Sequence, residues 1–424
     1  MFKVSSIEVS GFWQKYKVAS NFDDNVNIVI GKNGTGKTTF MNILHAVLSV
    51  DATGLFENDF STATLQLSDG RKKRKISIEK IDSKDVPYII AIYKISTRKY
   101  AIPIYSSDES RVLPTSIRRI AAEETNKLKQ ELSQLVALAS LSVYRITADI
   151  DPEVRDRASK RTVSPVDLRL GNLMQKLTSY QLELSTEARS ISAQLQRDVL
   201  VSLLYQKGSS DEPRFSLNFD ESLERRNLTA AYKQLGVSGS DVSVRIREHT
   251  AAIGEATRNL QEMMRSSDSD SVGSHYDFSP LEAYQRTARV IALSLESAGK
   301  IDAVYKQIKD FLDILHSFIQ DKKFEFQAGS LRLVDNAEIG IERLSSGEKQ
   351  LLILFIEALL QRQKSYIFLA DEPELSLHIA WQRNIISAIR RINPNAQIIV
   401  ATHSPEVASK FPEKIIDMED IRHV

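Results

Sequence analysis

LSSGEKQ (Leu344–Gln350) opens a stretch near the end of the chain that continues with FLADEPE (Phe368–Glu374) and ATHS (Ala401–Ser404). A glycine-rich loop, GKNGTGKT (Gly31–Thr38), begins 344 − 31 = 313 residues before the first of them. Apolar runs stand directly before the glycine loop, the acidic pair and ATHS, and such runs are typical of buried parallel strands. The order predicts one α/β fold built from both ends of the chain, with a long insertion between them.

The composition is that of a folded globular protein without a dominant charge. Hydrophobic residues make up 42% of the 424 residues and charged residues 26%, which argues against long disordered regions. The net charge of +1 gives no global attraction to nucleic acid, so any DNA contact must be local. The chain has no cysteine, which excludes disulfides and cysteine zinc sites.

Neither end of the chain predicts a membrane segment. MFKVSSIEVSGFWQKYKV at the start alternates apolar and polar residues, which predicts a strand and not a signal peptide. No apolar run reaches the roughly 18 residues of a membrane span, so we expect no membrane contact and a cytoplasmic protein. At the other end, IIDMEDIRHV (residues 415–424) predicts a single last strand.

Three kinds of pattern follow one another between these ends. The apolar run Val26–Ile30 predicts a strand, Thr38–Val50 has helical spacing, and the period-two pattern of Thr62–Ile104 predicts a small antiparallel sheet. Long helical patterns follow at Ser116–Leu138, Pro165–Leu204, Asp241–Met264 and Pro280–Lys322. We therefore predict an N-terminal lobe with a β subdomain over residues 1–115, an inserted helical arm over 116–322 and a C-terminal lobe over 323–424.

The glycine loop matches the complete phosphate-binding pattern GxxxxGK[ST]. Glycines let the loop wrap with its N–H groups directed at phosphate oxygens, Lys37 neutralises phosphate charge, and the Thr38 hydroxyl ligates Mg²⁺. The alternative is a chance glycine turn before a helix, and the preceding strand and following helix argue against it. The predicted nucleotide-binding residues are Asn33, Gly34, Thr35, Gly36, Lys37, Thr38 and Thr39.

The acidic pair after the apolar run SYIFLA is the second part of this chemistry. In P-loop enzymes the carboxylate at the end of such a strand holds Mg²⁺, and the next one polarises the attacking water. These roles fall to Asp371 and Glu372. The alternative is an exposed acidic turn.

LSSGEKQ resembles the signature of ABC-type ATPases, in which Ser346 and Gly347 take the positions that contact the γ-phosphate held by the opposite subunit. Ser346 replaces the first glycine of the usual LSGG pattern. Taken alone, the same letters would more often be a helix cap. By the same resemblance His403 in ATHS is the switch histidine, which joins Glu372 and Lys37 as a predicted catalytic residue; a lone histidine after a strand would usually be structural.

Together the motifs resemble ABC-type ATPases related to SMC, RecF and OLD proteins. The resemblance implies an α/β P-loop head, with a mixed sheet, an antiparallel β lobe and an inserted helical arm. It also implies that two heads sandwich ATP and Mg²⁺, so the chain would form a homodimer or a larger homo-oligomer of head pairs that hydrolyses ATP to ADP and phosphate.

The resemblance extends to stand-alone ATPases of prokaryotic antiphage systems, including the PARIS type, through PVDLRLGNLMQKLTSYQLEL (residues 165–184). It implies a partner effector in trans, such as a Toprim-like nuclease, and a phage protein as trigger. The alternative is a RecF-like or SMC-like DNA-repair ATPase that clamps DNA. A transporter ATPase would have about 100 residues between its motifs and a Q-loop glutamine, as the family resemblance implies, and this chain has neither.

Three further features leave their interpretation open. No glutamine stands where a Q-loop is expected, near Tyr144–Thr147, so no residue is assigned there. Trp13 and Tyr16 are equally consistent with contacts to adenine and with strand-edge packing. The basic run Arg71–Lys75 could bind phosphates or an acidic partner, but a solvated hairpin tip is the favoured interpretation.

Overall fold

The computed structural model describes residues 1–82, 88–105, 114–142, 164–202, 219–265, 277, 279–334 and 340–424. The chain forms two compact units. The first unit contains Met1–Ser179 and Ile308–Val424, and the second contains Tyr180–Gln307. Within the described ranges, no helix is long and apolar enough to cross a membrane.

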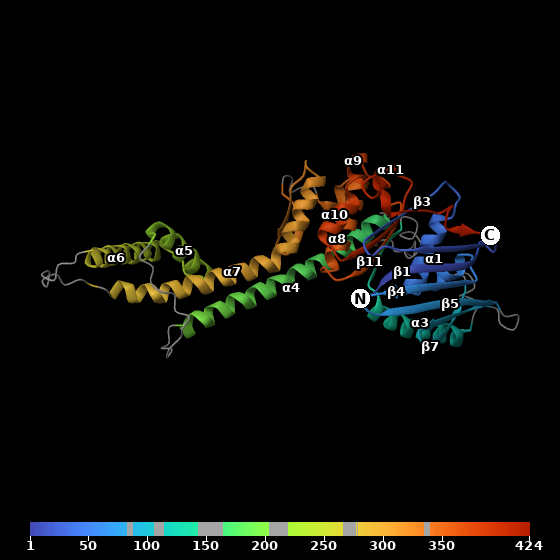
Figure 1. Ribbon diagram of the computed structural model, residues 1–424, viewed down its shortest axis with the longest axis horizontal. Helices are drawn as coiled ribbons and strands as arrows, with labels where there is room; N and C mark the ends of the chain where they lie inside the picture. Colours follow the sequence, from blue (N-terminus) through green and yellow to red (C-terminus); the bar gives the residue numbers. More distant parts are fainter. Residues whose placement is uncertain are drawn as a thin grey trace, which may run out of the picture. The chain divides into compact units, whose positions relative to one another are not determined.

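A five-stranded parallel sheet lies at the centre of the first unit (Figure 1). Its order is β13-β3-β12-β11-β8, and every neighbouring pair is parallel. β11 and β12 are buried along their whole length, as expected for strands covered on both faces. The strand bounds are β3 Val26–Ile30, β8 Leu138–Ser142, β11 Tyr366–Asp371, β12 Ala396–Ala401 and β13 Ile415–Asp417.

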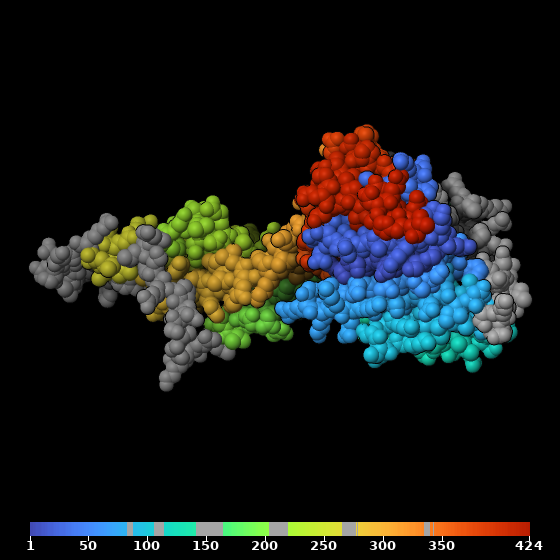
Figure 2. Space-filling view, turned by 45° about the vertical axis from the view of Figure 1, so that its right-hand side comes forward, coloured from blue at the N-terminus to red at the C-terminus, as the bar shows by residue number. Residues whose placement is uncertain are grey.

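A seven-stranded antiparallel sheet of order β14-β2-β1-β4-β5-β6-β7 forms the rest of the β structure of this unit, with a separate hairpin. The predicted antiparallel sheet over Thr62–Ile104 is confirmed as β4 to β7. In the space-filling view of Figure 2, light-blue residues from the part of the chain that contains β4 to β7 lie on the surface of this unit. The bounds are β1 Lys3–Phe12, β2 Tyr16–Asn21, β4 Thr62–Ser68, β5 Lys73–Asp82, β6 Ile89–Ile95, β7 Arg98–Ile104 and β14 Arg422–His423, and the hairpin is β9 Phe324–Gln327 with β10 Ser330–Leu333.

A buried glutamine joins the two large sheets. The Gln397 side chain of β12 accepts a hydrogen bond from the Val4 N–H of β1 at 2.8 Å and donates to the Val4 carbonyl at 2.7 Å. Gln397 has no exposed surface, so both polar ends of its amide need such partners. The two sheets therefore have a fixed separation at this point.

The predicted single strand at 415–424 is wrong. The segment forms two short strands, β13 in the parallel sheet and β14 in the antiparallel sheet. A turn separates them, because the Asp417 carboxylate accepts the Glu419 N–H at 2.9 Å and the Asp420 N–H donates to the Asp417 carbonyl at 3.2 Å. An Asp at the start of a tight turn is the reason why the apolar alternation does not continue as one strand.

Helices complete both units. The predicted helix at Thr38–Val50 is α1 Lys37–Ser49, and α5 Glu221–Gln234 has no counterpart among the predicted segments. The remaining helices are α2 Ala52–Glu57, α3 Thr115–Leu135, α4 Pro165–Ser202, α6 Ser240–Arg265, α7 Ser279–Phe318, α8 Ser346–Leu360, α9 Ile379–Gln382, α10 Ile385–Ile392 and α11 Pro405–Ala408.

The boundaries of the two compact units differ from those of the lobes and arm that the sequence predicts. The predicted arm begins at 116, whereas the second unit covers only residues 180–307. The reason lies in α3, whose Leu128 and Leu132 are buried in the core that the antiparallel sheet forms with α1. The domain limits 1–115, 116–322 and 323–424 stay a prediction.

Candidate functional site

Three loops with candidate residues meet at one edge of the parallel sheet. β12 lies between β3 and β11. The register pairs Val29 with Ala401 and Ala401 with Asp371, so the three strands end at one level. The glycine loop follows β3, His403 follows β12, and Glu372 follows β11. This edge is where ligands bind in open parallel sheets.

The glycine loop has a backbone that only glycine adopts without strain. Gly34 has a φ of 80° and Gly36 a φ of 102°. A β-carbon on Gly36 would lie 2.8 Å from the Phe12 ring and 3.1 Å from Trp13, whereas one on Gly34 would meet open space. Gly36 is therefore needed for close packing beneath the loop, and Gly34 leaves the outer side of the loop open to a ligand.

Lys37, the first residue of α1, is buried and holds the loop together. Its Nζ donates to the Gly31 carbonyl at 2.8 Å and to the Lys32 carbonyl at 3.0 Å. Burial lowers the pKa of Lys37, and the nearby carboxylates of Glu372 and Asp371 act in the opposite direction. A buried ammonium with only carbonyl oxygens as partners can gain further stabilisation from an anion.

Asp371 ends β11 as a buried carboxylate beside Thr38. Burial raises its pKa, and the charges of Glu372 and Glu374 raise it further, while Thr38 and Lys37 lower it. A divalent cation would relieve this repulsion, so the Thr38 hydroxyl and the Asp371 carboxylate fit a Mg²⁺ ion.

Within the described ranges, no three His, Cys, Asp or Glu side chains form a metal cage. Mg²⁺ does not require one, since it commonly binds one or two protein groups together with water and substrate phosphates. The absence of a cage is therefore compatible with the Thr38 and Asp371 assignment.

Glu372 has a backbone conformation that is rare for its type. Its φ is 50°, and its N–H donates to the Ala401 carbonyl of β12 at 2.8 Å. Such a conformation costs of order 1 kcal/mol and persists where the surrounding structure holds it. The Glu372 carboxylate lies 3.7 Å from Nε2 of His403, and both side chains are partly exposed. The two predicted catalytic side chains are thus brought together at the surface of the sheet edge.

Glu374 is a residue of this site to which the sequence analysis gave no role. Its Oε1 accepts hydrogen bonds from the Thr402 hydroxyl, from the His403 N–H at 3.2 Å and from the Ser404 N–H at 3.3 Å. Its Oε2 is buried without a partner. Glu374 therefore holds the loop that carries His403. The sequence feature that could have identified Glu374 is its position as a third carboxylate, two residues after the acidic pair.

The signature begins helix α8 with a complete capping box. The Ser345 hydroxyl accepts the Glu348 N–H, and the Glu348 carboxylate accepts the Ser345 N–H at 2.8 Å. Ser345 is thus the helix cap, which leaves Ser346 and Gly347 as the first helical residues. Ser346 is exposed at this positively polarised helix end. The helix-cap alternative and a phosphate-contact role therefore fall on different residues.

Gly347 packs against the segment that follows the acidic motif. A β-carbon there would lie 2.4 Å from the Ser376 carbonyl oxygen, and Ser376 itself has a φ of 67°. Among the described residues, no hydrogen bond connects Ser346 or Gly347 to the glycine loop. The signature and the glycine loop of one chain are therefore not hydrogen-bonded to each other.

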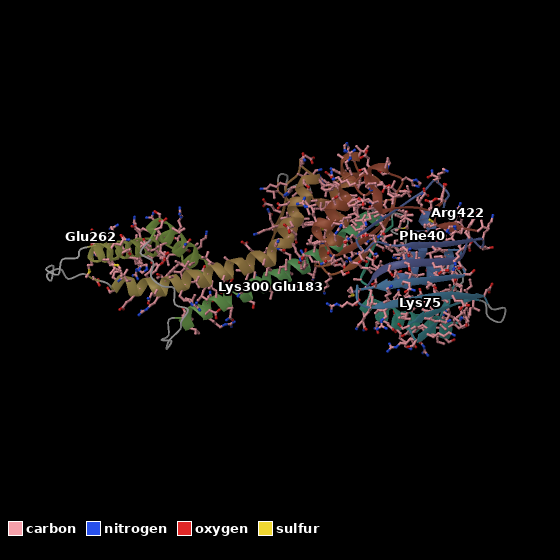
Figure 3. All side chains as sticks on the ribbon, viewed as in Figure 1. Phe40, Lys75, Glu183, Glu262, Lys300 and Arg422 are labelled. Atoms are coloured by element: carbon pink, nitrogen blue, oxygen red, sulfur yellow. The ribbon has the colours of Figure 1, made fainter. Side chains whose placement is uncertain are left out.

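Two aromatic residues lie beside the glycine loop. Trp13 packs on Phe12 with a centroid distance of 5.0 Å and borders Gly36. The Tyr16 ring lies beneath the Arg422 guanidinium at 4.6 Å, and Arg422 donates to the Thr35 carbonyl at 3.3 Å. Figure 3 labels Arg422 near α1. Both roles considered for these aromatics stay open, and the Tyr144–Thr147 region lies outside the described residues.

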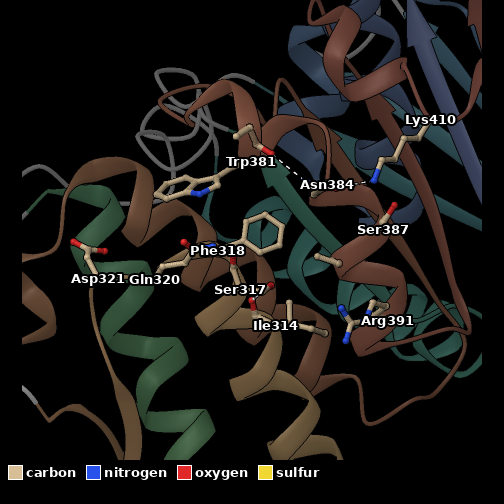
Figure 4. A pocket seen from close by; sticks show the side chains of 12 residues that line it. Ile314, Ser317, Phe318, Gln320, Asp321, Trp381, Asn384, Ser387, Arg391 and Lys410 are labelled. Carbon is tan, nitrogen blue, oxygen red and sulfur yellow. Dashed lines mark hydrogen bonds between the residues drawn. The ribbon is translucent and has the colours of Figure 1, made fainter.

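Two of the cavities in the first unit differ in their relation to the candidate residues. One of about 620 Å³ is lined by Gly31, Lys32 and His403 and thus adjoins the sheet edge. The other, of about 780 Å³, is lined by the end of α7 with α9 and α10 and contains no candidate residue (Figure 4). Trp381 and Asn384 line it, and Lys410 donates to the Asn384 side chain at 2.6 Å. The first cavity alone belongs to the candidate site.

Comparison with known proteins finds relatives by sequence and by structure. The chain is 31% identical to the retron Ec83 probable ATPase of Escherichia coli over 142 residues, which cover 30% of this chain and 26% of that protein. It is 38% identical to the Septu protein PtuA of Bacillus thuringiensis over 86 residues, 17% of this chain and 22% of that protein. These matches thus span about a quarter of the relatives' lengths.

A solved Smc head domain with an extended coiled coil from Pyrococcus furiosus, bound to the C-terminal domain of ScpA, is similar at a TM-score of 0.43 and 14% identity, covering 98% of this chain and 93% of that one. The model of the AAA ATPase domain family matches residues 2–408, nearly the whole chain and all the motifs described above. The chain belongs to the AAA ATPase domain family.

Proposed function

We propose that the chain is an ATP-hydrolysing head that works in pairs, or in larger assemblies of such pairs. Each ATP would lie between the glycine loop of one copy and the signature helix of the other. The exposure of Ser346 supports this proposal, because among the described residues it has no hydrogen bond to the glycine loop of its own chain. A second copy would complete the site.

The residues of the sheet edge divide the chemistry among them. The N–H groups of the glycine loop and the Lys37 ammonium bind the phosphates. Thr38 and Asp371 would hold Mg²⁺, which in such sites neutralises phosphate charge. Glu372 orients the attacking water and accepts its proton, and His403 contacts the γ-phosphate. The products of this reaction are ADP and phosphate.

One observation carries this proposal. The ends of β3, β12 and β11 are level in the register, and each is followed by a different chemical part: the phosphate loop, the histidine and the acidic pair. The backbone of Glu372 is a second observation that supports the proposal. Its positive φ is strained, and the hydrogen bond to the Ala401 carbonyl holds it in place.

Mixing two inactive variants tests the shared site. Lys37→Ala removes the phosphate-binding ammonium, and Ser346→Arg blocks the signature. If each site takes its loop from one copy and its signature from the other, an equal mixture should regain about a quarter of the wild-type ATPase rate, since half of random dimers are mixed and each has one intact site. Each variant alone should be inactive.

The control for this experiment is a mixture in which both copies carry Lys37→Ala. It should show no recovery under any condition. An inactive mixture of the two different variants, with both proteins folded and binding each other, would mean that each site is built within one chain.

We further infer that the head controls a partner effector in prokaryotic antiphage defence, with a Toprim-like nuclease in trans as the favoured class and a phage protein as trigger. The similarity to the retron Ec83 probable ATPase and to Septu PtuA supports this inference. Phage should form fewer plaques on cells that carry the gene for this chain with its neighbouring genes than on control cells, and Lys37→Ala should restore the plaque number. Equal plaque numbers on cells with the wild-type chain and on cells with Lys37→Ala would contradict an ATP-dependent role.

A further inference from the structure

A basic pocket opens between α5 and α6 in the second unit. Its volume is about 540 Å³, and the described residues that line it include four cationic side chains and no carboxylate. Figure 1 shows α5 beside α6. The sequence separates the Arg225-Arg226 pair from the fourth cation by 247 − 226 = 21 residues, so only the fold brings them together. The four cations are Arg225, Arg226 and Lys233 of α5 and Arg247 of α6.

The helical spacing explains why these side chains share one face. Arg225 and Lys233 are eight residues apart, about two turns, and line the pocket with Thr229 between them. The opposite faces of the two helices are apolar, since Leu228 of α5 and Ile246 of α6 form a buried cluster with Ile291 of α7. The cations therefore lie on the solvent side, where all four are exposed.

No neighbouring acid neutralises this group. Among the described residues, none of the four cations takes part in an ion pair, in contrast to Lys300 of the same unit, which pairs with Glu296 at 2.7 Å. Glu224 precedes Arg225 in the chain, but burial alone raises the pKa of Glu224, with no contribution from a cation. Four like charges around one hollow repel each other unless an anion binds there.

We propose that this pocket binds the phosphate backbone of duplex DNA. Three of its four cations are arginines, whose planar guanidinium groups bind phosphate oxygens through paired hydrogen bonds. Among the described residues no aromatic side chain lines the pocket, so stacking on unpaired bases has no platform there and contacts to the backbone are the mode that this lining supports. The near-neutral net charge of the chain makes this local site, and not a global field, the source of attraction.

Salt-dependent binding of the full chain to a fluorescent DNA duplex tests this proposal. Each lost phosphate contact should lower the slope of log affinity against log salt by about 0.9, so Arg225→Gln with Arg247→Gln should lower it by about 1.8. At about 0.1 M salt this corresponds to roughly 60-fold weaker binding. The ATPase rate should not change, because neither residue belongs to the sheet edge.

Matched variants on the same unit provide the control. Arg286→Gln with Arg289→Gln removes two exposed arginines of α7 that do not line the pocket, and it should leave the slope within about 0.5 of wild type. Equal losses in both double variants would overturn the proposal in favour of a general charge effect, and so would the absence of duplex binding by the wild type. Tighter binding of fluorescent polyglutamate than of the duplex at equal charge concentration would overturn the proposal in favour of an acidic protein.

Discussion

Removal of the Glu374 carboxylate is the perturbation that tests the organisation of the site most directly. Glu374 is 7% exposed, and its Oε1 is the acceptor for three donors of the loop that carries His403. In Glu374→Ala the buried Thr402 hydroxyl and the part-buried His403 N–H lose this acceptor, whereas the Ser404 N–H keeps the Thr402 hydroxyl oxygen at 2.9 Å. Hydrogen bonds to a charged group contribute about 1.5–3 kcal/mol each, and they are not additive, so we expect a loss of about 3–5 kcal/mol in unfolding free energy.

The Glu374→Gln variant separates hydrogen bonding from charge. Its amide oxygen can still accept all three hydrogen bonds, and its amide nitrogen takes the place of Oε2, which has no partner. We therefore expect a loss of only about 1–2 kcal/mol, because the bonds weaken without being lost. Chemical denaturation followed by intrinsic fluorescence measures both values.

Glu374→Ala should affect the ATPase reaction by displacing His403. A displacement of a catalytic group by about 1 Å costs about 100-fold in rate, so Glu374→Ala should lower kcat by about that factor with little change in KM for ATP. In a His403→Ala background the same substitution should have almost no further effect on kcat. A further 100-fold loss in that background, or a wild-type kcat in the single variant, would refute the positioning role of Glu374.

Two other substitutions test the loop and a buried charge. Gly36→Ala should abolish ATP affinity in a binding titration, because its β-carbon would lie 2.8 Å from the Phe12 ring. Gly70→Ala, at a similar positive φ but in open space outside the loop, should leave the affinity unchanged, and equal losses in both variants would contradict the packing argument. Lys80 has its pKa lowered to about 8 by burial, with Asp59 opposing the shift. The unfolded chain then binds one more proton between about pH 8 and pH 10.5, so this group makes stability rise with pH across that window, by less than about 3 kcal/mol after solvent screening. Lys80→Met should flatten that rise in pH-dependent denaturation, and an unchanged pH profile would refute the assignment.

Sequence alone identifies the parts of the site that are local in the chain. The glycine loop is recognisable because its spacing, its lysine and its flanking strand and helix all lie within about 25 residues, and Asp371 and Glu372 follow directly from the apolar run before them. Their meeting at one sheet edge also follows, since the carboxyl ends of parallel strands share an edge.

The contacts that depend on distant parts of the chain could not be predicted in this way. The amphipathic pattern of α3 shows that one face is buried, but it does not show that the partner is the antiparallel sheet and not another arm helix. The bonds of Glu374 to the His403 loop cross 28 residues in sequence. The pocket between α5 and α6 depends on a helix that the sequence pattern did not reveal and on Arg247 of the next one.

The distribution of charge at the sheet edge explains why the site should respond to its ligands. The charges of Glu372 and Glu374 both act on Asp371, whereas Lys37, on which Glu372 and Asp371 act, donates to two loop carbonyls. Burial raises the pKa of Asp371, and the charges of Glu372 and Glu374 raise it further, so a bound cation would stabilise its ionised form. A bound cation would neutralise the carboxylates, and a bound anion would neutralise the Lys37 ammonium. A nucleotide with its metal ion supplies both charges. Glu374 acts on Asp371 and also accepts the His403 N–H, so we expect nucleotide binding to be coupled to the position of His403 through this one carboxylate.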